Sequence, residues 1–216
     1  MLNKVKESVV YPFADPNWLK RVGYWLLYYL LSITTPALFG HYLKIVEQTA
    51  TDVENETIPE FEDVWELWKR GFLSLLGVGF LQVIPALLNM LAAFYFISTH
   101  DPDQGTGPPT GFLVCFGIHA LLLFLTLFLF PAFSIQVTKT KDWQSLFKLR
   151  EVASITRANI GSYIVLVFFP FFSWLALALL TFTGIGVLLV IPALPLVFFA
   201  HARLTGHYYR DYVLQK

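Results

Sequence analysis

The chain has 216 residues, of which 56% are hydrophobic and only 14% are charged. That composition excludes a single soluble domain with a polar exterior, so lipid has to cover part of the surface. The 15 Lys and Arg residues balance the 15 Asp and Glu residues, and the overall charge therefore gives no reason to expect nucleic acid as a partner. Cys115 is the only cysteine, which excludes an internal disulfide.

The N-terminal part of the chain combines an interfacial segment with an uncharged stretch. Residues 1–21 are predicted to lie at the membrane interface, because the aromatic Trp18 stands just before the basic Lys20. Residues 22–43 carry no charge and are long enough for one crossing. We expect them instead to form a re-entrant hairpin that turns around Thr34–Pro36. A full fifth transmembrane helix is the alternative.

The middle of the chain holds two predicted transmembrane helices. Residues 44–70 are predicted to form an acidic linker and an amphipathic helix. The windows 71–98 and 111–137 contain no Asp, Glu, Lys or Arg, and each exceeds the roughly 20 residues that cross a hydrocarbon core. We therefore expect one transmembrane helix in each window.

The C-terminal part repeats this pattern after a basic loop. Residues 138–161 are predicted to form a basic interfacial loop, and the uncharged stretch that follows is long enough for two helices, at 162–181 and 184–204. Residues 205–216 form the tail. The predicted fold is an all-α integral membrane protein with one membrane domain. It has four transmembrane helices, the N-terminal re-entrant or fifth segment, and short interfacial amphipathic helices.

The distribution of basic residues predicts the orientation. The loop from Lys139 to Arg157 is rich in Lys and Arg, whereas the loop around Asp101 and Asp103 has none. Because basic loops stay on the cytoplasmic side, the former loop is predicted to be inside, and alternation places the C-terminus there as well. With a re-entrant hairpin at residues 22–43, all 15 basic residues share that side. We expect a multi-pass protein of the cell's inner (plasma) membrane with a cytoplasmic C-terminus.

Several short motifs follow one another along the chain. They are Asp-Pro-Asn-Trp-Leu-Lys at 15–20, Gly-His-Tyr-Leu at 40–43, Ile-Pro-Glu-Phe at 58–61, Asn-Ile-Gly-Ser-Tyr at 159–163 and Gly-His-Tyr-Tyr-Arg at 206–210. In these motifs and their order the sequence resembles the prokaryotic membrane family catalogued as domain of unknown function 4013. The resemblance spans nearly the whole chain. It implies an integral membrane protein and brings no activity, so no functional residue follows from it.

Two groups of polar residues are candidate sites. Asn89 and His119 stand at similar depths in neighbouring predicted spans, where they would meet as an intramembrane polar pair. Such a pair is interpreted either as an interhelical hydrogen bond or as a proton or substrate site. Basic residues of the predicted inner face are candidate lipid headgroup contacts, because Lys and Arg reach phosphates from interfacial segments. These residues are Lys20, Arg21, Lys69, Arg70, Lys148, Arg203 and Arg210.

No catalytic, metal or cofactor motif stands out in the sequence. We therefore predict a non-enzymatic protein that organises the membrane or binds a partner, without metal or cofactor. The expected partners are the lipid bilayer, another copy of the chain or another membrane protein, and not nucleic acid. The alternative is a small oligomeric transporter or channel subunit, motivated by prolines in every predicted membrane element and by Asn89 with His119. A lipid-modifying enzyme is a third hypothesis, and Arg203, His207 and Arg210 form the polar cluster that it would use.

Overall fold

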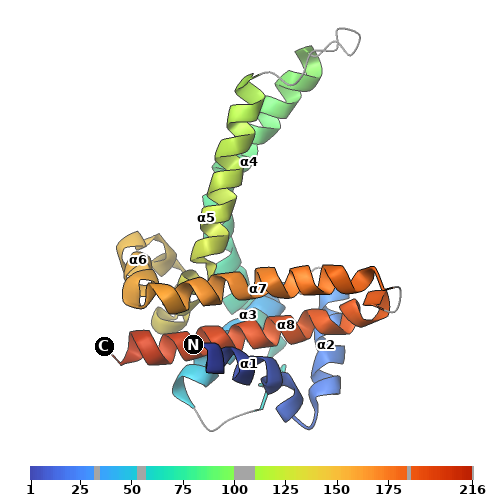
Figure 1. Cartoon of the computed structure of the whole chain (residues 1–216). Coiled ribbons are helices and arrows are strands. Elements are labelled where there is room, and N and C mark those ends of the chain that lie inside the picture. Colours follow the sequence, from blue (N-terminus) through green and yellow to red (C-terminus); the bar gives the residue numbers. More distant parts are fainter. Residues whose placement is uncertain (32–34, 53–56, 100–109, 184–185, 216) are drawn as a thin grey trace.

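The computed structural model describes residues 1–31, 35–52, 57–99, 110–183 and 186–215. Every regular element in these ranges is helical, which confirms the predicted all-α fold class (Figure 1). The helices are α1 (Leu2–Ala14), α2 (Trp18–Leu30), α3 (Thr35–Thr51), α4 (Val64–Thr99), α5 (Thr110–Thr140), η3 (Trp143–Phe147), α6 (Leu149–Ala158), α7 (Ile160–Thr181), α8 (Gly186–Tyr209) and η4 (Arg210–Leu214).

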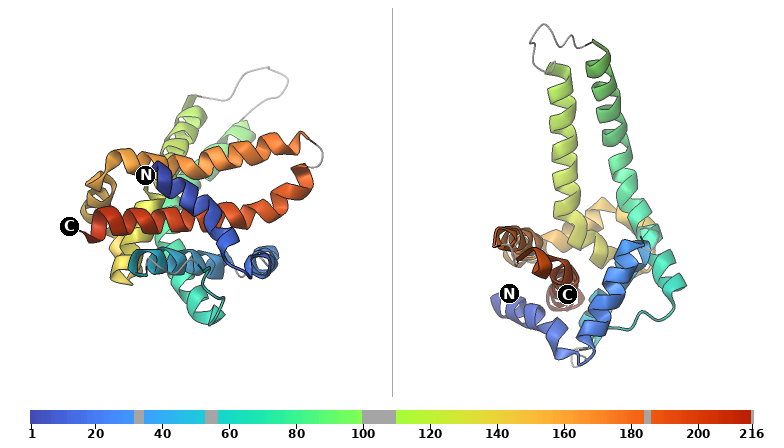
Figure 2. Two further views of the ribbon diagram at one scale, coloured as in Figure 1. Left: turned by 60° about the horizontal axis from the view of Figure 1, so that its bottom comes forward. Right: turned by 90° about the vertical axis from the view of Figure 1, so that its right-hand side faces the viewer.

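A helical body and two helical hairpins make up the molecule. α4 and α5 run side by side and project away from the body, as Figures 1 and 2 show. α7 and α8 form the second hairpin, which lies across the base of the first and points in a different direction. α1, α2 and α3 pack against α8, and α3 also packs against the lower part of α4. The body therefore joins the two hairpins.

Three helices in the described part of the chain are long and apolar enough to cross a membrane. They are Thr110–Thr140, Ile160–Thr181 and Leu189–Leu214, with mean hydropathies of 2.6, 2.4 and 1.5. Only 6% of the apolar window is buried in each of the first two, so their surfaces call for a covering other than water. In α4, the apolar stretch among the described residues, Pro85–Ile97, is shorter. The chain is thus an all-helical protein with three candidate membrane-spanning helices.

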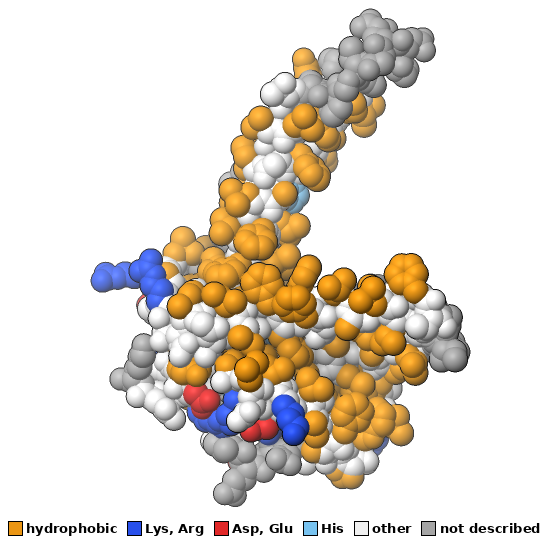
Figure 3. Space-filling view, in the orientation of Figure 1, with side chains coloured by type: hydrophobic (Ala, Val, Ile, Leu, Met, Phe, Trp, Pro, Cys, Tyr) orange, Lys and Arg blue, Asp and Glu red, His pale blue; other side chains and the backbone are white. Residues whose placement is uncertain are grey.

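Among the described residues, charged side chains are confined to one part of the molecule. Residues 71–99 and 110–138 contain no Lys, Arg, Asp or Glu, so the projecting part of the α4–α5 hairpin is uncharged. Figure 3 shows hydrophobic side chains over both hairpins, and charged side chains over the lower part of the body and beside α6. Water suits the charged surface, whereas lipid suits the surface of the hairpins.

The predicted re-entrant segment, residues 22–43, is divided between α2 and α3. Pro36 lies in the first turn of α3, where its fixed backbone angle suits a helix start. The helix therefore breaks near the predicted turn, although residues 32–34 themselves lie outside the described part of the chain. From Ala37 to Leu43 every residue of α3 is buried. This half of the segment belongs to the protein core and does not face lipid.

Close packing and an ion-pair cluster join α3 to α4. Gly40 and Gly71 stand where the two helices touch, because a Cβ at either position would overlap a backbone carbonyl of the other helix. At the end of α3, the Glu47 carboxylate lies 2.8 Å from Arg70 of α4 and 3.2 Å from Lys141. Burial raises the pKa of the Glu47 carboxyl, but hydrogen bonds and charges from Arg70 and Lys141 outweigh this effect and hold the pKa below its usual value. Glu47 therefore stays ionised and ties three segments together.

Candidate functional site

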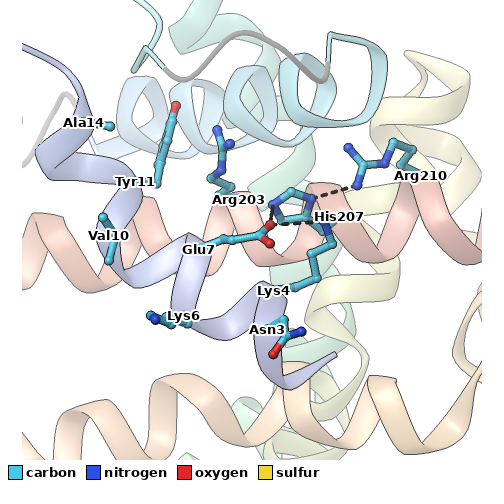
Figure 4. A pocket seen from close by; sticks show the side chains of 10 residues that line it. All are labelled: Asn3, Lys4, Lys6, Glu7, Val10, Tyr11, Ala14, Arg203, His207 and Arg210. Atoms are coloured by element: carbon cyan, nitrogen blue, oxygen red, sulfur yellow. Dashed lines mark hydrogen bonds and ion pairs between the residues drawn. The ribbon is translucent and has the colours of Figure 1, made fainter.

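A pocket opens in the body between α1 and α8. Its volume is about 530 Å³, which is within the range of small-molecule sites. Most of its lining comes from α1, and the remainder comes from the end of α8 and the start of η4 (Figure 4). The polar lining side chains are Asn3, Lys4, Lys6, Glu7, Tyr11, Arg203, His207 and Arg210.

The helical spacing of α1 gathers polar side chains at the pocket. Asn3 and Glu7 are four residues apart and share a face, and Lys4 joins them through an ion pair of 3.1 Å with Glu7. Tyr11 follows one turn later, and its hydroxyl donates to the carbonyl oxygen of Thr57 at 3.0 Å. Burial raises the pKa of Tyr11, so the hydroxyl keeps its proton and continues to donate. The hydrogen bond anchors this end of α1 to the body.

The end of α8 presents the other side of the pocket. Arg203, His207 and Arg210 follow a helical spacing, and the Arg203 guanidinium lies 4.2 Å from the centre of the Tyr11 ring in a cation–π contact. Arg210 Nη2 donates to His207 Nδ1 at 3.2 Å, and His207 Nε2 lies 3.9 Å from the Glu7 carboxylate. Because Nδ1 accepts this bond, the ring proton is assigned to Nε2, which faces Glu7.

The pocket carries a surplus of positive charge. Four cationic side chains, Lys4, Lys6, Arg203 and Arg210, line it with one carboxylate, Glu7, and Asp211 next to the lining pairs with Arg210 Nε at 2.8 Å, which leaves the cations in excess. Nη1 of Arg210 is buried and has no hydrogen-bond partner in the described structure, so a donor of the lining is left unsatisfied. A phosphate fits this arrangement, because guanidinium and ammonium groups donate strong hydrogen bonds to anionic oxygens.

The predicted headgroup contacts are divided between this pocket and other parts of the surface. The structure brings Arg203 and Arg210 together in the pocket. Lys20 is exposed elsewhere on the body, and Lys69 and Lys148 keep 45% and 59% of their side-chain surface exposed. Lys69 pairs with Glu66 and Lys148 lies near Glu151, but both pairs are on the exposed surface, so the three lysines remain accessible to headgroups outside the pocket.

Arg21 and Arg70 are engaged inside the protein. Arg21 is only 7% exposed and lies 3.0 Å from Glu60 and 3.5 Å from Asp15. Arg70 is paired with Glu47. Because carboxylates already compensate both guanidinium groups, the geometry assigns these two arginines to the stability of the body.

The predicted polar pair meets inside the α4–α5 hairpin. The side-chain amide nitrogen of Asn89 donates to Nδ1 of His119, and the amide nitrogen of Gln82 donates to the Thr126 hydroxyl nearer the base of the hairpin. Both bonds link the two helices of one hairpin, which favours the structural interpretation of the pair. Within the described ranges, no group of three or more His, Cys, Asp or Glu side chains is placed to hold a metal ion.

Comparison with known proteins identifies the family of the chain. Residues 25–191, well over half of the sequence, match the family described as protein of unknown function (DUF4013). The chain belongs to the DUF4013 family. The resemblance to this family is therefore confirmed over residues 25–191, whereas the motifs at 15–20 and 206–210 lie outside the match. The DUF4013 match begins after α1 and ends before Arg203, so the residues that form the pocket lie outside it. No curated protein and no solved structure matches the chain.

The α1 half of the pocket is missing from the sequence prediction. Residues 1–21 precede the DUF4013 match. In this segment the polar Asn3 and Glu7 are four residues apart and the apolar Leu2 and Val5 are three apart, as on two faces of a helix. That pattern is typical of an amphipathic helix and would have indicated α1. The contact of α1 with α8 joins opposite ends of the chain, and the sequence holds no local signal for such a contact.

Proposed function

We propose that the protein is a non-enzymatic membrane protein that gathers acidic phospholipids at its basic face. The observation that carries the proposal is the pocket between α1 and α8, in which four cations accompany one carboxylate. The division of the surface into a charged body and apolar hairpins also supports it, because acidic headgroups collect where a basic surface meets the hydrocarbon boundary. Its partners are then the lipid bilayer and, through the exposed faces of the hairpins, further copies of the chain.

We further propose that α4, α5, α7 and α8 provide four crossings and that the α2–α3 segment stays on the basic side. The lengths and hydropathies of α5, α7 and α8 support this arrangement, as does the charge-free window 71–98. By the positive-inside rule, the body and the C-terminus face the cytoplasm at the plasma membrane. The α7–α8 hairpin is the element to test, since it points away from the direction of α4 and α5 (Figure 1).

Cysteine labelling is expected to place the tips of both hairpins outside. In a Cys115→Ser background, Asp103→Cys and Thr183→Cys should react with an impermeant maleimide added to intact cells, while Lys6→Cys and Lys148→Cys should be protected. Reaction at 103 with protection at 183 would show that α7 and α8 do not cross, which reduces the number of crossings to two. Reaction at 6 and 148 with protection at 103 would reverse the orientation.

Reconstituted protein is expected to concentrate acidic lipid. In phosphatidylcholine vesicles that contain self-quenching fluorescent phosphatidylglycerol, the protein should lower the fluorescence, and added salt should restore it by screening. Each lysine near an acidic surface contributes about 1 kcal/mol, so a combined Lys20→Gln, Lys69→Gln and Lys148→Gln variant should reduce the quenching severalfold.

The matched control removes exposed negative charges, in a combined Asp52→Asn and Glu62→Gln variant, and should quench like the unaltered protein. The proposal would be contradicted if the protein quenched labelled phosphatidylcholine equally, or if the triple lysine variant quenched labelled phosphatidylglycerol as strongly as the unaltered protein. The same vesicles test the alternative function. A protein-dependent leak of entrapped potassium that is lost in Asn89→Leu or His119→Leu would favour an oligomeric transporter or channel subunit.

A further inference from the structure

A second, apolar groove lies on the other side of α1. It has a volume of about 660 Å³ and runs between the first turn of α1 and α7. Leu2 and Val5 line it from α1, and seven side chains between Ile164 and Ala176 line it from α7. All of these α7 side chains except Ser173 are apolar, so the groove suits a hydrocarbon and offers almost nothing to a polar ligand.

α1 separates the groove from the cationic pocket, and one of its lysines lies between them. On a helix with 3.6 residues per turn, Leu2 and Val5 point to one side, whereas Asn3 and Glu7 point to the other. Lys6 falls between these two directions. A ligand that contacts Lys6 can therefore reach both the cationic pocket and the apolar groove.

We propose that one acidic phospholipid molecule binds across α1, with its phosphate in the pocket between α1 and α8 and one acyl chain in the groove between α1 and α7. The inference rests on the proposed function, because it names the ligand of the same pocket. Lys4 and Lys6 hold the phosphate from α1, and Arg210 donates to it from the opposite side. Basic pockets beside membrane helices bind acidic lipid headgroups through the same chemistry.

The length of the groove fits one acyl chain. The α7 residues from Ile164 to Ala176 extend over about 18 Å at 1.5 Å per residue. One leaflet is about 15 Å deep, which is half of a hydrocarbon core of about 30 Å. A chain lying along α7 would therefore contact this helix over most of its length and meet Leu2 and Val5 of α1 over one turn.

The groove also exposes aromatic surface that an acyl chain would cover. Phe168 and Phe172 are 40% and 60% exposed. Because α7 is proposed to cross the bilayer, an acyl chain in the groove gains van der Waals contacts with these rings and replaces the contacts of a mobile lipid. Figure 3 shows charged side chains below the apolar surface on the face where α1 lies, and a bound phospholipid would place its own polar boundary at this level.

Native mass spectrometry of the full chain in detergent tests the inference with defined lipids. Phosphatidylglycerol and its one-chain lyso form should each be retained at about tenfold lower concentration than phosphatidylcholine with the same chains. Excess inorganic phosphate should displace neither lipid, because it cannot use the groove.

Two variants separate the headgroup contacts from the chain contacts. A combined Lys4→Gln and Lys6→Gln variant should weaken phosphatidylglycerol binding about tenfold through the lost charges. Its matched control is Lys139→Gln with Arg157→Gln, which removes two exposed charges outside the pocket. Helical content measured by circular dichroism shows that each variant is folded.

Filling the groove tests the position of the chain. Ala176→Phe should weaken binding of both lipids about tenfold, because the new ring occupies the space of the chain. Ala178→Phe adds the same ring on the opposite face of α7, outside the groove, and should change nothing.

Each half of the inference has an outcome that overturns it. Unchanged binding in the Lys4→Gln and Lys6→Gln variant would show that the lipid phosphate does not bind in the pocket. Displacement by inorganic phosphate, together with unchanged binding in Ala176→Phe, would make the pocket a site for free phosphate and leave the groove without a chain. The quenching assay measures many lipids gathered by the exposed lysines and tests the proposed function. Native mass spectrometry measures one retained lipid and tests the present inference, so a failure of either can be told from a failure of the other.

Discussion

A Gly71→Ala substitution is expected to lower the free energy of unfolding by about 3 kcal/mol or more. The added Cβ would overlap the backbone carbonyl of Pro36, and no side-chain rotation can relieve an overlap with backbone. α3 and α4 would have to move apart, which opens the core that the buried middle of α3 fills. Gly40→Ala should have an effect of the same size, because it would meet the backbone of Leu67 from the other side. Thermal unfolding in detergent measures both.

Gly79→Ala is the matched control on the same helix. A Cβ at Gly79 would have no neighbour within 4 Å, so this variant should unfold at the same temperature as the unaltered protein or slightly above it. If Gly71→Ala behaved like Gly79→Ala, the close approach of α3 and α4 would not exist in the folded protein.

An Asp15→Ala substitution is expected to cost about 3 kcal/mol, because it leaves the buried N–H of Ile58 without an acceptor and takes from Arg21 the buried one of its two carboxylates. Asp15 is 1% exposed, and its carboxylate accepts from the backbone nitrogens of Asn17 at 2.7 Å and Ile58 at 3.1 Å. The same carboxylate lies 3.5 Å from Arg21 Nε. One side chain therefore joins the corner between α1 and α2 to the segment that leads into α4, and its loss should also loosen α1 over the pocket.

Glu60→Gln provides the comparison for Asp15. Glu60 contacts the same Arg21 but has a side chain that is 58% exposed, so water replaces most of what the charge contributes. Its substitution should change the free energy of unfolding by about 1 kcal/mol or less. Equal destabilisation by Asp15→Ala and Glu60→Gln would show that the buried hydrogen bonds of Asp15 add nothing.

The long apolar elements and the break between α2 and α3 were predictable from local sequence. The uncharged windows at 111–137 and 162–181 correspond to α5 and α7. Both could be predicted because the length and hydropathy of a helix are read from consecutive residues alone. Pro36 marked the break by its preference for the first turn of a helix. The sequence could not show that the stretch after Pro36 is protein core, since apolar residues suit lipid and core equally.

The pairing of charges was beyond local sequence patterns. Arg21 resembles a headgroup contact because it follows Lys20 at the interface, yet it folds against Glu60, which lies 39 residues further along the chain. Only tertiary packing decides which arginines meet carboxylates and which remain available. Asn89 and His119 were easier to pair, because their positions along two neighbouring predicted helices follow from helical rise alone.

Gln82 and Asn89 both bond to partners on α5, which is the next helix to be synthesised. The bonded residues are only 44 and 30 positions apart, so both partners are present once the ribosome has released this hairpin. An unpaired donor in hydrocarbon is costly, and in the proposed four-crossing arrangement these bonds give both amides an acceptor within the hairpin itself. We therefore expect α4 and α5 to enter a bilayer as one unit, independently of the contacts that α8 makes with α3.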